Sequence, residues 1–191
     1  KCNNPKAQSL LGHIYIEGKY CKKNIEKSIH YLTLAANQND INSQYYLGLI
    51  YCSGEHCKRD INKSIHYLTL SADKNHENSQ LLLATIYYDN LFIKRDINKA
   101  IHYFQLAANQ NNSEAQLKLG LIYSENKYIN KDISKAIYYL SLSANNNNSE
   151  ALFKLGFIYF ENNFIQKAIE CFDLSGKLGN FVSYFNLGII Y

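Results

Sequence analysis

The chain has 191 residues, of which 47% are hydrophobic and 19% charged, and its net charge is +4. This apolar content excludes a globally disordered chain, and the modest charge does not indicate the clustered basic face of a nucleic-acid-binding protein. No apolar run approaches the roughly 18 residues of a transmembrane helix, and no signal peptide is visible.

One unit of 36 residues recurs along the chain, and it is marked by Tyr15, Tyr51, Tyr87, Tyr123 and Tyr159. A repeat of this period predicts a stack of helical hairpins, which buries its apolar faces between neighbouring units instead of in one central core. We expect a single array with units at residues 7–42, 43–78, 79–114, 115–150 and 151–182 and a partial unit at 183–191.

The first half of each unit predicts an amphipathic helix, because apolar residues recur there at helical spacing. A small residue interrupts this helix in each full unit, at Gly12, Gly48, Ala84, Gly120 and Gly156. Glycine inside a helix costs about 1 kcal/mol relative to alanine, so we expect a neighbouring helix to approach closely at this position. The helix ends on a column of glycine and asparagine that predicts left-handed caps, at Gly18, Gly54, Asn90, Asn126 and Asn162.

A loop of about seven residues follows, and a second helix then begins at a predicted N-cap in four units, Asn24, Asp60, Asp96 and Asp132. The fifth unit lacks four residues of this loop, which predicts a tight turn after Asn162. A sixth first helix begins after Gly179, and no second helix follows it. We therefore expect its apolar side chains to be poorly covered, and we interpret the chain as part of a longer array.

The unit combines L-G-x-x-Y, a glycine or asparagine cap, D-x-x-K-[AS]-I and a closing pair of small residues, as in YYLGLIYCSG followed by DINKSIHYLTLSA. With this pattern the chain resembles Sel-1-like repeats of the tetratricopeptide-like superfamily over nearly all of residues 5–191. The resemblance implies an all-α fold, a right-handed α-α superhelical solenoid of about five helical hairpins plus one extra helix. It also implies a scaffold or adaptor that binds another protein or a peptide on its concave face.

In similar repeats the first helices line the inner face of the superhelix, so the resemblance also implies which side chains form a partner-binding groove. The predicted groove residues are Tyr45, Leu49, Leu81, Tyr88, Leu117, Leu121, Phe153, Phe157 and Phe160. An acidic edge of the groove is predicted at Glu17, Asp89, Glu125 and Glu161. Packing between adjacent units is the alternative explanation for the apolar stripe.

Other residue patterns offer little chemistry. His30, His66 and His102 share one column, but helices pack about 8–10 Å apart and zinc ligands must converge within about 2.0–2.1 Å of the metal. We expect an exposed ridge and predict no metal, catalytic or cofactor-binding residues. Lysine and arginine precede several N-caps, which indicates either solvent-facing loop charge or a contact with phosphates or an acidic partner.

Two further interpretations stay open. The chain is the regulatory repeat region of a larger enzyme, such as a protein kinase, or it is a β-lactamase-like hydrolase, although no S-x-x-K motif with a matching S-D-N or K-T-G is present. The five unpatterned cysteines favour reduced thiols and an intracellular, cytoplasmic location. The sequence does not determine the oligomeric state.

Overall fold

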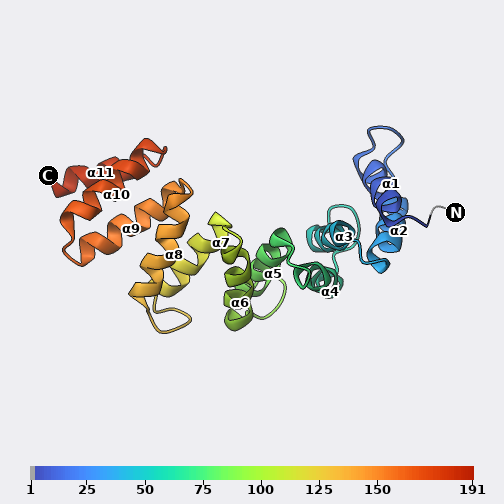
Figure 1. Ribbon diagram of the computed structural model, residues 1–191, viewed down its shortest axis with the longest axis horizontal. Helices are drawn as coiled ribbons and strands as arrows, with labels where there is room; N and C mark the ends of the chain where they lie inside the picture. Colours follow the sequence, from blue (N-terminus) through green and yellow to red (C-terminus); the bar gives the residue numbers. More distant parts are fainter. Residues whose placement is uncertain (1–2) are drawn as a thin grey trace. The chain divides into compact units, whose positions relative to one another are not determined.

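The computed structural model describes residues 3–191, and over that range it contains α-helices and no strand (Figure 1). The eleven helices are α1 (Pro5–Glu17), α2 (Ile25–Asn37), α3 (Ile41–Ser53), α4 (Ile61–Ala72), α5 (Glu77–Asp89), α6 (Ile97–Asn109), α7 (Ser113–Ser124), α8 (Ile133–Asn145), α9 (Ser149–Glu161), α10 (Ile165–Lys177) and α11 (Val182–Ile190). They fall into two compact units, residues 1–103 and residues 104–191, with the boundary inside α6.

Successive helices pair as antiparallel hairpins within each unit. In the first unit α1 packs against α2 and α3 packs against α4, and in the second unit α7 packs against α8 and α9 against α10. The final helix, α11, packs on α10. Loops of seven residues, 18–24 and 54–60, close the first two hairpins as the repeat predicted. None of the helices described is long and apolar enough to cross a membrane.

The glycine inside the first helices α1, α3, α7 and α9 allows close approach of the second helix, as predicted. A Cβ atom added to Gly48 would lie 2.5 Å from Leu68 Cγ, and one added to Gly12 would lie 2.6 Å from Leu32 Cγ. The second unit repeats this contact between Gly120 and Leu140 at 2.5 Å. These leucines are fully buried, so the glycine column fixes the spacing between the two helices of a hairpin.

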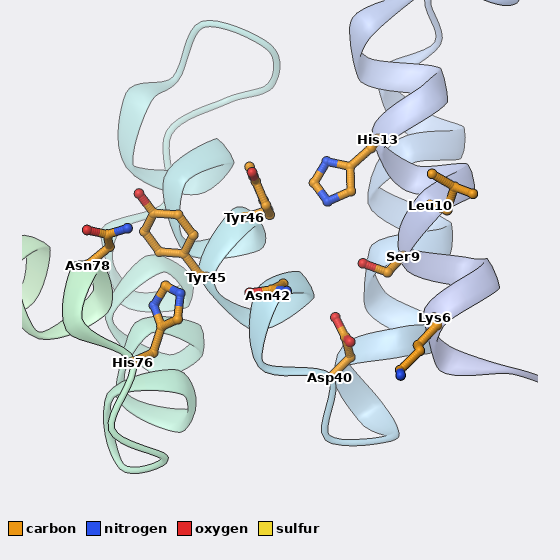
Figure 2. Close-up of a pocket in the computed structure, with 10 residues that line it drawn as sticks. All are labelled: Lys6, Ser9, Leu10, His13, Asp40, Asn42, Tyr45, Tyr46, His76 and Asn78. Atoms are coloured by element: carbon orange, nitrogen blue, oxygen red, sulfur yellow. The ribbon is translucent and has the colours of Figure 1, made fainter.

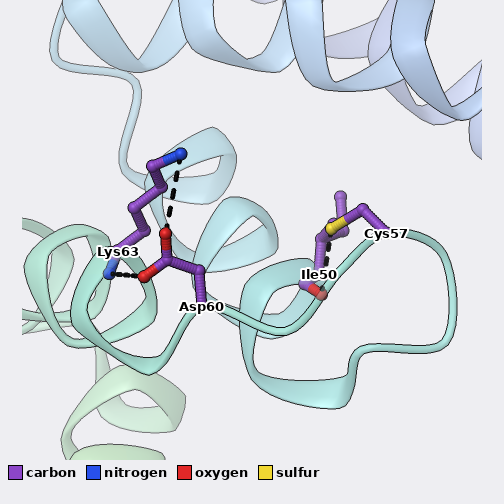
Figure 3. A network of polar contacts seen from close by, with 4 residues as sticks. All are labelled: Ile50, Cys57, Asp60 and Lys63. Atoms are coloured by element: carbon purple, nitrogen blue, oxygen red, sulfur yellow. Dashed lines mark hydrogen bonds and ion pairs between the residues drawn. The ribbon is translucent and has the colours of Figure 1, made fainter.

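The loop of the second hairpin shows how the other repeated residues close each unit (Figure 3). The Asp60 backbone N–H donates to the Tyr51 carbonyl oxygen at 3.0 Å, and the Asp60 side chain accepts the Lys63 backbone N–H at 3.0 Å. The Lys63 ammonium lies 3.6 Å from the second carboxylate oxygen and 5.2 Å from the centroid of the Tyr51 ring. Tyr51 itself stacks on Tyr67. The predicted aspartate N-cap is therefore confirmed, and the repeated tyrosine belongs to the same closure.

The arginines of the predicted basic loops are not simply solvent-facing charges. Arg59 Nε donates to the Cys52 carbonyl oxygen at 2.9 Å, and Arg59 Nη2 donates to that of Ser53 at 2.8 Å. Arg95 Nε likewise donates to the Tyr88 carbonyl oxygen. The last carbonyl groups of a helix have no partner within the helix, so these arginines cap the ends of α3 and α5.

The predicted column of left-handed caps is correct in the first three hairpins and wrong in the last two. Gly18, Gly54 and Asn90 have φ angles of 70°, 70° and 57°. In contrast, α7 ends one residue earlier, at Ser124, and its C-cap Glu125 has a φ of −104°. Asn162 has a φ of −98° because the shortened loop moves the left-handed residue one position on, to Asn163.

The fifth hairpin has the predicted tight turn, since only residues 162–164 separate α9 from α10. The Phe164 backbone N–H donates to the Tyr159 carbonyl oxygen at 2.9 Å, which preserves the closing bond of the longer loops. Phe164 supplies no side-chain cap for α10. Cys171 is the residue on α10 that corresponds to Tyr67, and burial raises the pKa of its thiol to about 11.

A buried glutamine joins consecutive hairpins, and the sequence pattern did not reveal it. Gln44 Nε2 donates to the Ala36 carbonyl oxygen at 3.1 Å, and Gln44 Oε1 accepts from Lys74 Nζ at 3.2 Å. Gln116 has equivalent bonds to Ala108 and Asn146. Each amide thus ties the end of the preceding hairpin to both helices of its own.

Candidate functional site

The first unit contains an open cleft of about 530 Å³ on the side of the first helices α1, α3 and α5. Four rings form a row along it (Figure 2). His13 of α1 meets Tyr46 edge-to-face with a centroid distance of 4.1 Å, and Tyr46 lies 5.4 Å from Tyr45. The ring of His76, which precedes α5, lies 4.8 Å from Tyr45. The row therefore draws its members from α1, α3 and the residue that precedes α5.

Polar groups complete the lining of this cleft. Asp40 is the N-cap of α3, and its Oδ1 accepts the Ser43 backbone N–H at 2.7 Å. Lys6, Asn42 and Asn78 also line the cleft. Figure 2 shows Asp40 and Lys6 together at one end of it, away from the Tyr45 ring. The cleft thus combines aromatic faces with one carboxylate and one ammonium group.

Both histidines of the row are partly buried, and this lowers the pKa of each imidazole. Desolvation is the main cause at His13, where Glu17 and Asp40 act in the opposite direction. Desolvation also lowers the pKa of His76, and Glu77 opposes it. His76 is the N-cap of α5, and its Nδ1 accepts the Ser79 backbone N–H at 3.3 Å. Both rings are therefore neutral at pH 7.

The second unit contains a smaller, almost wholly apolar pocket of about 190 Å³ between α9, α10 and α11. Phe157 and Phe160 of α9 line it and are 37% and 39% exposed. Behind them, Phe172 of α10 meets Phe157 edge-to-face at 5.4 Å between centroids. Ile189 of α11 forms the opposite wall and is 62% exposed.

The helix α11 presents an uncovered apolar face, as predicted. Phe181, Phe185 and Ile189 are all largely exposed. Gly188 occupies the position of the close helix contact, yet within residues 3–191 no other helix comes within 4 Å of the place its Cβ would take. In the preceding hairpin the same slot, Gly156, is filled by the ring of Phe172 at 2.6 Å.

The predicted groove residues lie in both compact units and differ in their exposure. Tyr45 lines the cleft of the first unit, and Phe157 and Phe160 line the pocket of the second. Leu117 is only 6% exposed, so it offers almost no surface. The remaining members are partly buried, namely Leu49, Leu81, Tyr88, Leu121 and Phe153.

The four residues of the predicted acidic edge are exposed, and each stands at the end of a first helix. Glu17, Asp89 and Glu161 are the last residues of α1, α5 and α9, and Glu125 is the C-cap of α7. A carboxylate at a helix C-terminus opposes the helix dipole. Helix stability therefore does not explain this column.

Sequence reasoning missed most of the cleft, namely His13, Asp40, Tyr46 and His76. A signal was present, because each of them departs from its column. Tyr46 occupies a position that holds leucine at Leu10 and Leu82, and His76 stands where the later units have asparagine. A departure alone does not say which other residues lie beside it, so the row emerges only in three dimensions.

The histidine column on the second helices is an exposed ridge, as expected. His30, His66 and His102 are exposed, and each meets the next tyrosine edge-to-face at 5.1–5.3 Å between centroids. Within residues 3–191 no group of three potential metal ligands converges. Cys57 Sγ lies 3.9 Å from the Ile50 carbonyl oxygen, so this loop thiol packs against the end of α3 (Figure 3). Cys2 lies outside the described residues.

A model of the Sel1 repeat family matches five consecutive stretches, residues 5–40, 41–76, 78–112, 113–148 and 149–180. The chain belongs to the Sel1 repeat family. Sel1 repeats are tetratricopeptide-like helical repeats that generally mediate protein–protein interaction. The division into hairpins seen in the structure follows the matched stretches. The chain has no significant match among curated proteins.

Solved structures of Sel1 repeat proteins resemble this chain over nearly its whole length. A protective antigen of uropathogenic Escherichia coli strains with an SLR fold is 27% identical with a TM-score of 0.87, over 99% of this chain and 42% of that one. A Sel1 repeat protein from Oxalobacter formigenes is 28% identical with a TM-score of 0.77, over 99% and 79% of the two chains. A protein from Klebsiella pneumoniae, at 19% identity and a TM-score of 0.55, covers 98% and 93%. These likenesses confirm the predicted all-α solenoid, and this chain spans less than half of the first relative.

Proposed function

We propose that this chain is a non-catalytic scaffold or adaptor that binds a peptide or helix of another protein on the face formed by its first helices. One observation carries the proposal, namely the exposed phenylalanines Phe157 and Phe160 around an open apolar pocket. Exposed apolar patches of this kind are typical of protein-interaction sites, and aromatic side chains are typical anchors.

The surroundings of the pocket support a helix or peptide as the ligand. The pocket lies between helices, where an apolar side chain of a partner would be covered on several sides by Phe157, Phe160 and Ile189. Phe185 extends the apolar surface along α11 and is 71% exposed. Amphipathic helices bind such grooves through side chains spaced by three or four residues.

The acidic column supports a basic flank on the ligand. Glu161 ends α9, the helix that carries Phe157 and Phe160, and Glu125 caps α7 of the same unit. Both side chains are exposed, and their negative charge at a helix C-terminus is unfavourable with respect to the helix dipole. We therefore expect the partner segment to carry lysine or arginine beside its apolar anchors, since complementary charge favours association and orientation.

Peptides selected from a phage-displayed library on the purified chain would test this proposal. We expect Phe157→Asp and Phe160→Ala to weaken binding of the selected peptides, measured by fluorescence anisotropy, by about tenfold or more each. Tyr138→Asp is the matched control, because Tyr138 is an exposed aromatic residue of the second helix α8. Unchanged affinity in folded Phe157→Asp protein, checked by circular dichroism, would contradict the proposal.

A further inference from the structure

The ring row of the first unit is not part of the repeated fold. The column of His13 holds Leu49, Thr85, Leu121 and Phe157 in the other four repeats. The column of Tyr45 holds Ser9, Leu81, Leu117 and Phe153, and that of Tyr46 holds Leu10, Leu82, Lys118 and Lys154. Because the same hairpin forms without these rings, the fold does not account for their presence.

The geometry of the row suits a flat ligand. The rings of His13, Tyr46, Tyr45 and His76 follow one another at centroid distances of 4.1, 5.4 and 4.8 Å along a cleft of about 530 Å³. Their planes are tilted or perpendicular to one another. Such an arrangement presents both ring faces and ring edges to the cleft (Figure 2). A planar group therefore finds stacking partners in more than one orientation.

The charge around the row favours a cation. Asp40 lies in the cleft lining, and Glu17 and Asp40 both act on His13 electrostatically. Glu77 acts on His76 in the same sense. Lys6 is the one cationic side chain of the lining, and both histidines are neutral at pH 7. The tyrosine faces themselves attract positive charge.

We propose that this cleft binds the guanidinium group of an arginine in a partner peptide. The planar cation would stack on Tyr46, the ring next to His13, while its N–H groups donate to the Asp40 carboxylate. Asp40 Oδ1 already accepts from Ser43, so Oδ2 would accept from the ligand. Arginine suits the site better than lysine, because its planar fork both stacks on rings and pairs with carboxylates.

The side-chain amides of Asn42 and Asn78 give the site a way to hold the rest of the peptide. Both line the cleft and both are exposed. An asparagine amide both donates and accepts hydrogen bonds, so it matches the backbone N–H and carbonyl groups that flank the arginine. The site lies wholly in the first unit, and it is independent of the apolar pocket proposed above.

A titration with short peptides followed by NMR would test the arginine site. The probe is the capped pentapeptide Gly-Ser-Arg-Ser-Gly, and the comparison peptides carry citrulline, lysine or glutamate in place of arginine. We expect the arginine peptide to perturb amide signals of residues 6–13 and 40–46. Citrulline has the same shape without the charge, and we expect it to bind at least about tenfold more weakly, with lysine in between.

The repeat itself supplies substitutions that preserve the fold. Asp40→Asn retains an N-cap, because Asn112 and Asn148 fill that column and accept the backbone N–H groups of their own helices. Tyr46→Leu introduces the residue found at Leu10 and Leu82. We expect each variant to lose about tenfold in affinity for the arginine peptide. Phe160→Ala lies in the other unit and should leave this affinity unchanged.

Three results would overturn the arginine site. The first is equal binding of the arginine and citrulline peptides, and the second is wild-type affinity of Asp40→Asn. The third is stronger binding of the glutamate peptide, which would make the cleft an anion site built on Lys6. None of these results bears on peptide binding at Phe157, so failure of one proposal is distinguishable from failure of the other.

Discussion

The second hairpin, α3–α4, and the fifth, α9–α10, have the same fold, but one uses polar contacts where the other has apolar side chains. The second relies on polar contacts, with Gln44 bonded to Ala36 and Asp60 capping α4. The fifth has Leu152 in the glutamine column and a turn in which Phe164 supplies no cap. Their surfaces differ in the same way, since the second lines a polar, ring-bearing cleft and the fifth an apolar pocket. The fold therefore depends on the close contact between the two helices of a hairpin. The other side chains can differ between hairpins without changing the fold.

The largest expected effect tests helix spacing directly. Gly48→Val places methyl groups against Leu68, whose side chain already lies 2.5 Å from the position of a Cβ. We expect the free energy of unfolding to fall by about 3 kcal/mol, as for overpacked cores, measured by urea denaturation. Gly188→Val is the matched control in α11, where that space is open, and it should change stability by less than about 0.5 kcal/mol. Equal losses in the two variants would mean that helix propensity, not contact, sets the cost.

The next effect tests the polar joint between hairpins. Gln44→Leu introduces the residue of the fifth hairpin, and it removes the hydrogen bonds of the Gln44 amide to the Ala36 carbonyl oxygen and to Lys74. The Ala36 carbonyl oxygen still accepts the Asn39 backbone N–H at 2.9 Å. We expect a loss of about 1.5 kcal/mol in the free energy of unfolding, because two hydrogen bonds are lost and each contributes about 0.5–1.5 kcal/mol. The reciprocal change, Leu152→Gln, should cost less, since Leu152 lines an open hollow of about 270 Å³ that admits water. A neutral Gln44→Leu variant would show that the amide bonds do not stabilise the second hairpin.

Substitutions at the N-caps of α4 and α10 should change the stability of the chain in opposite directions. Asp60→Ala removes the side-chain oxygen that accepts the Lys63 backbone N–H, and we expect it to destabilise the chain by about 1 kcal/mol. Phe164→Asp supplies such a cap to α10, which lacks one, and we expect it to stabilise by up to about 1 kcal/mol. Thermal unfolding of both variants measures the pair. A destabilised Phe164→Asp protein would show that the Phe164 ring, which meets Tyr159 edge-to-face, contributes more than a cap does.

The smallest effect is a pH dependence confined to the first unit. Burial lowers the pKa of His13 and His76 below the ordinary 6.5, so the folded state binds fewer protons than the unfolded state. Stability should therefore be complete above pH 6.5 and should fall as the pH drops below that value towards the folded-state pKa values. Glu17, Asp40 and Glu77 oppose the shifts and keep the effect small.

Two variants isolate this pH dependence. His76→Asn introduces the N-cap residue that other repeats have at Asn112 and Asn148. His13→Leu introduces the residue that other repeats have at Leu49 and Leu121. Stability measured between pH 7 and pH 5 should decline less in the double variant than in the wild-type chain. An identical decline would assign the pH dependence to other groups.

Most of the fold could be predicted from the sequence, because its determinants recur. Gly48 and Asp60 each stand in a column, and a column of small residues or of caps has a direct physical meaning. Gln44 also recurs, at Gln8, Gln80 and Gln116, but glutamine within a helix is usually exposed, so its burial was not evident. The cap at Asn162 was predicted wrongly because the shortened loop moves the left-handed residue to Asn163. The cap at Asn126 was also predicted wrongly, since α7 is followed by Glu125 in an extended conformation although no residue is missing from its loop.

The candidate sites were less predictable than the fold, for a related reason. Phe157 and Phe160 were predicted as groove residues because they lie on a helix face that similar repeats expose. The ring row joins residues of α1, α3 and the start of α5, and His13 and Tyr46 lie 33 positions apart in the sequence. Periodicity places equivalent residues in line, but it says nothing of neighbours that occur only once. Such sites need the stacking geometry before they can be recognised.

The buried amide of Gln44 has a mechanical consequence. Hydrogen bonds are short-ranged and directional, so a small displacement of the Ala36 end from Gln44 breaks the joint abruptly. Leu152 makes only apolar contacts, which weaken gradually as surfaces slide. Under a pulling force, the joint at Gln44 should behave as a brittle link and the joint at Leu152 as a compliant one. We therefore expect the residue in the column of Gln44 and Leu152 to determine how each joint between hairpins resists deformation.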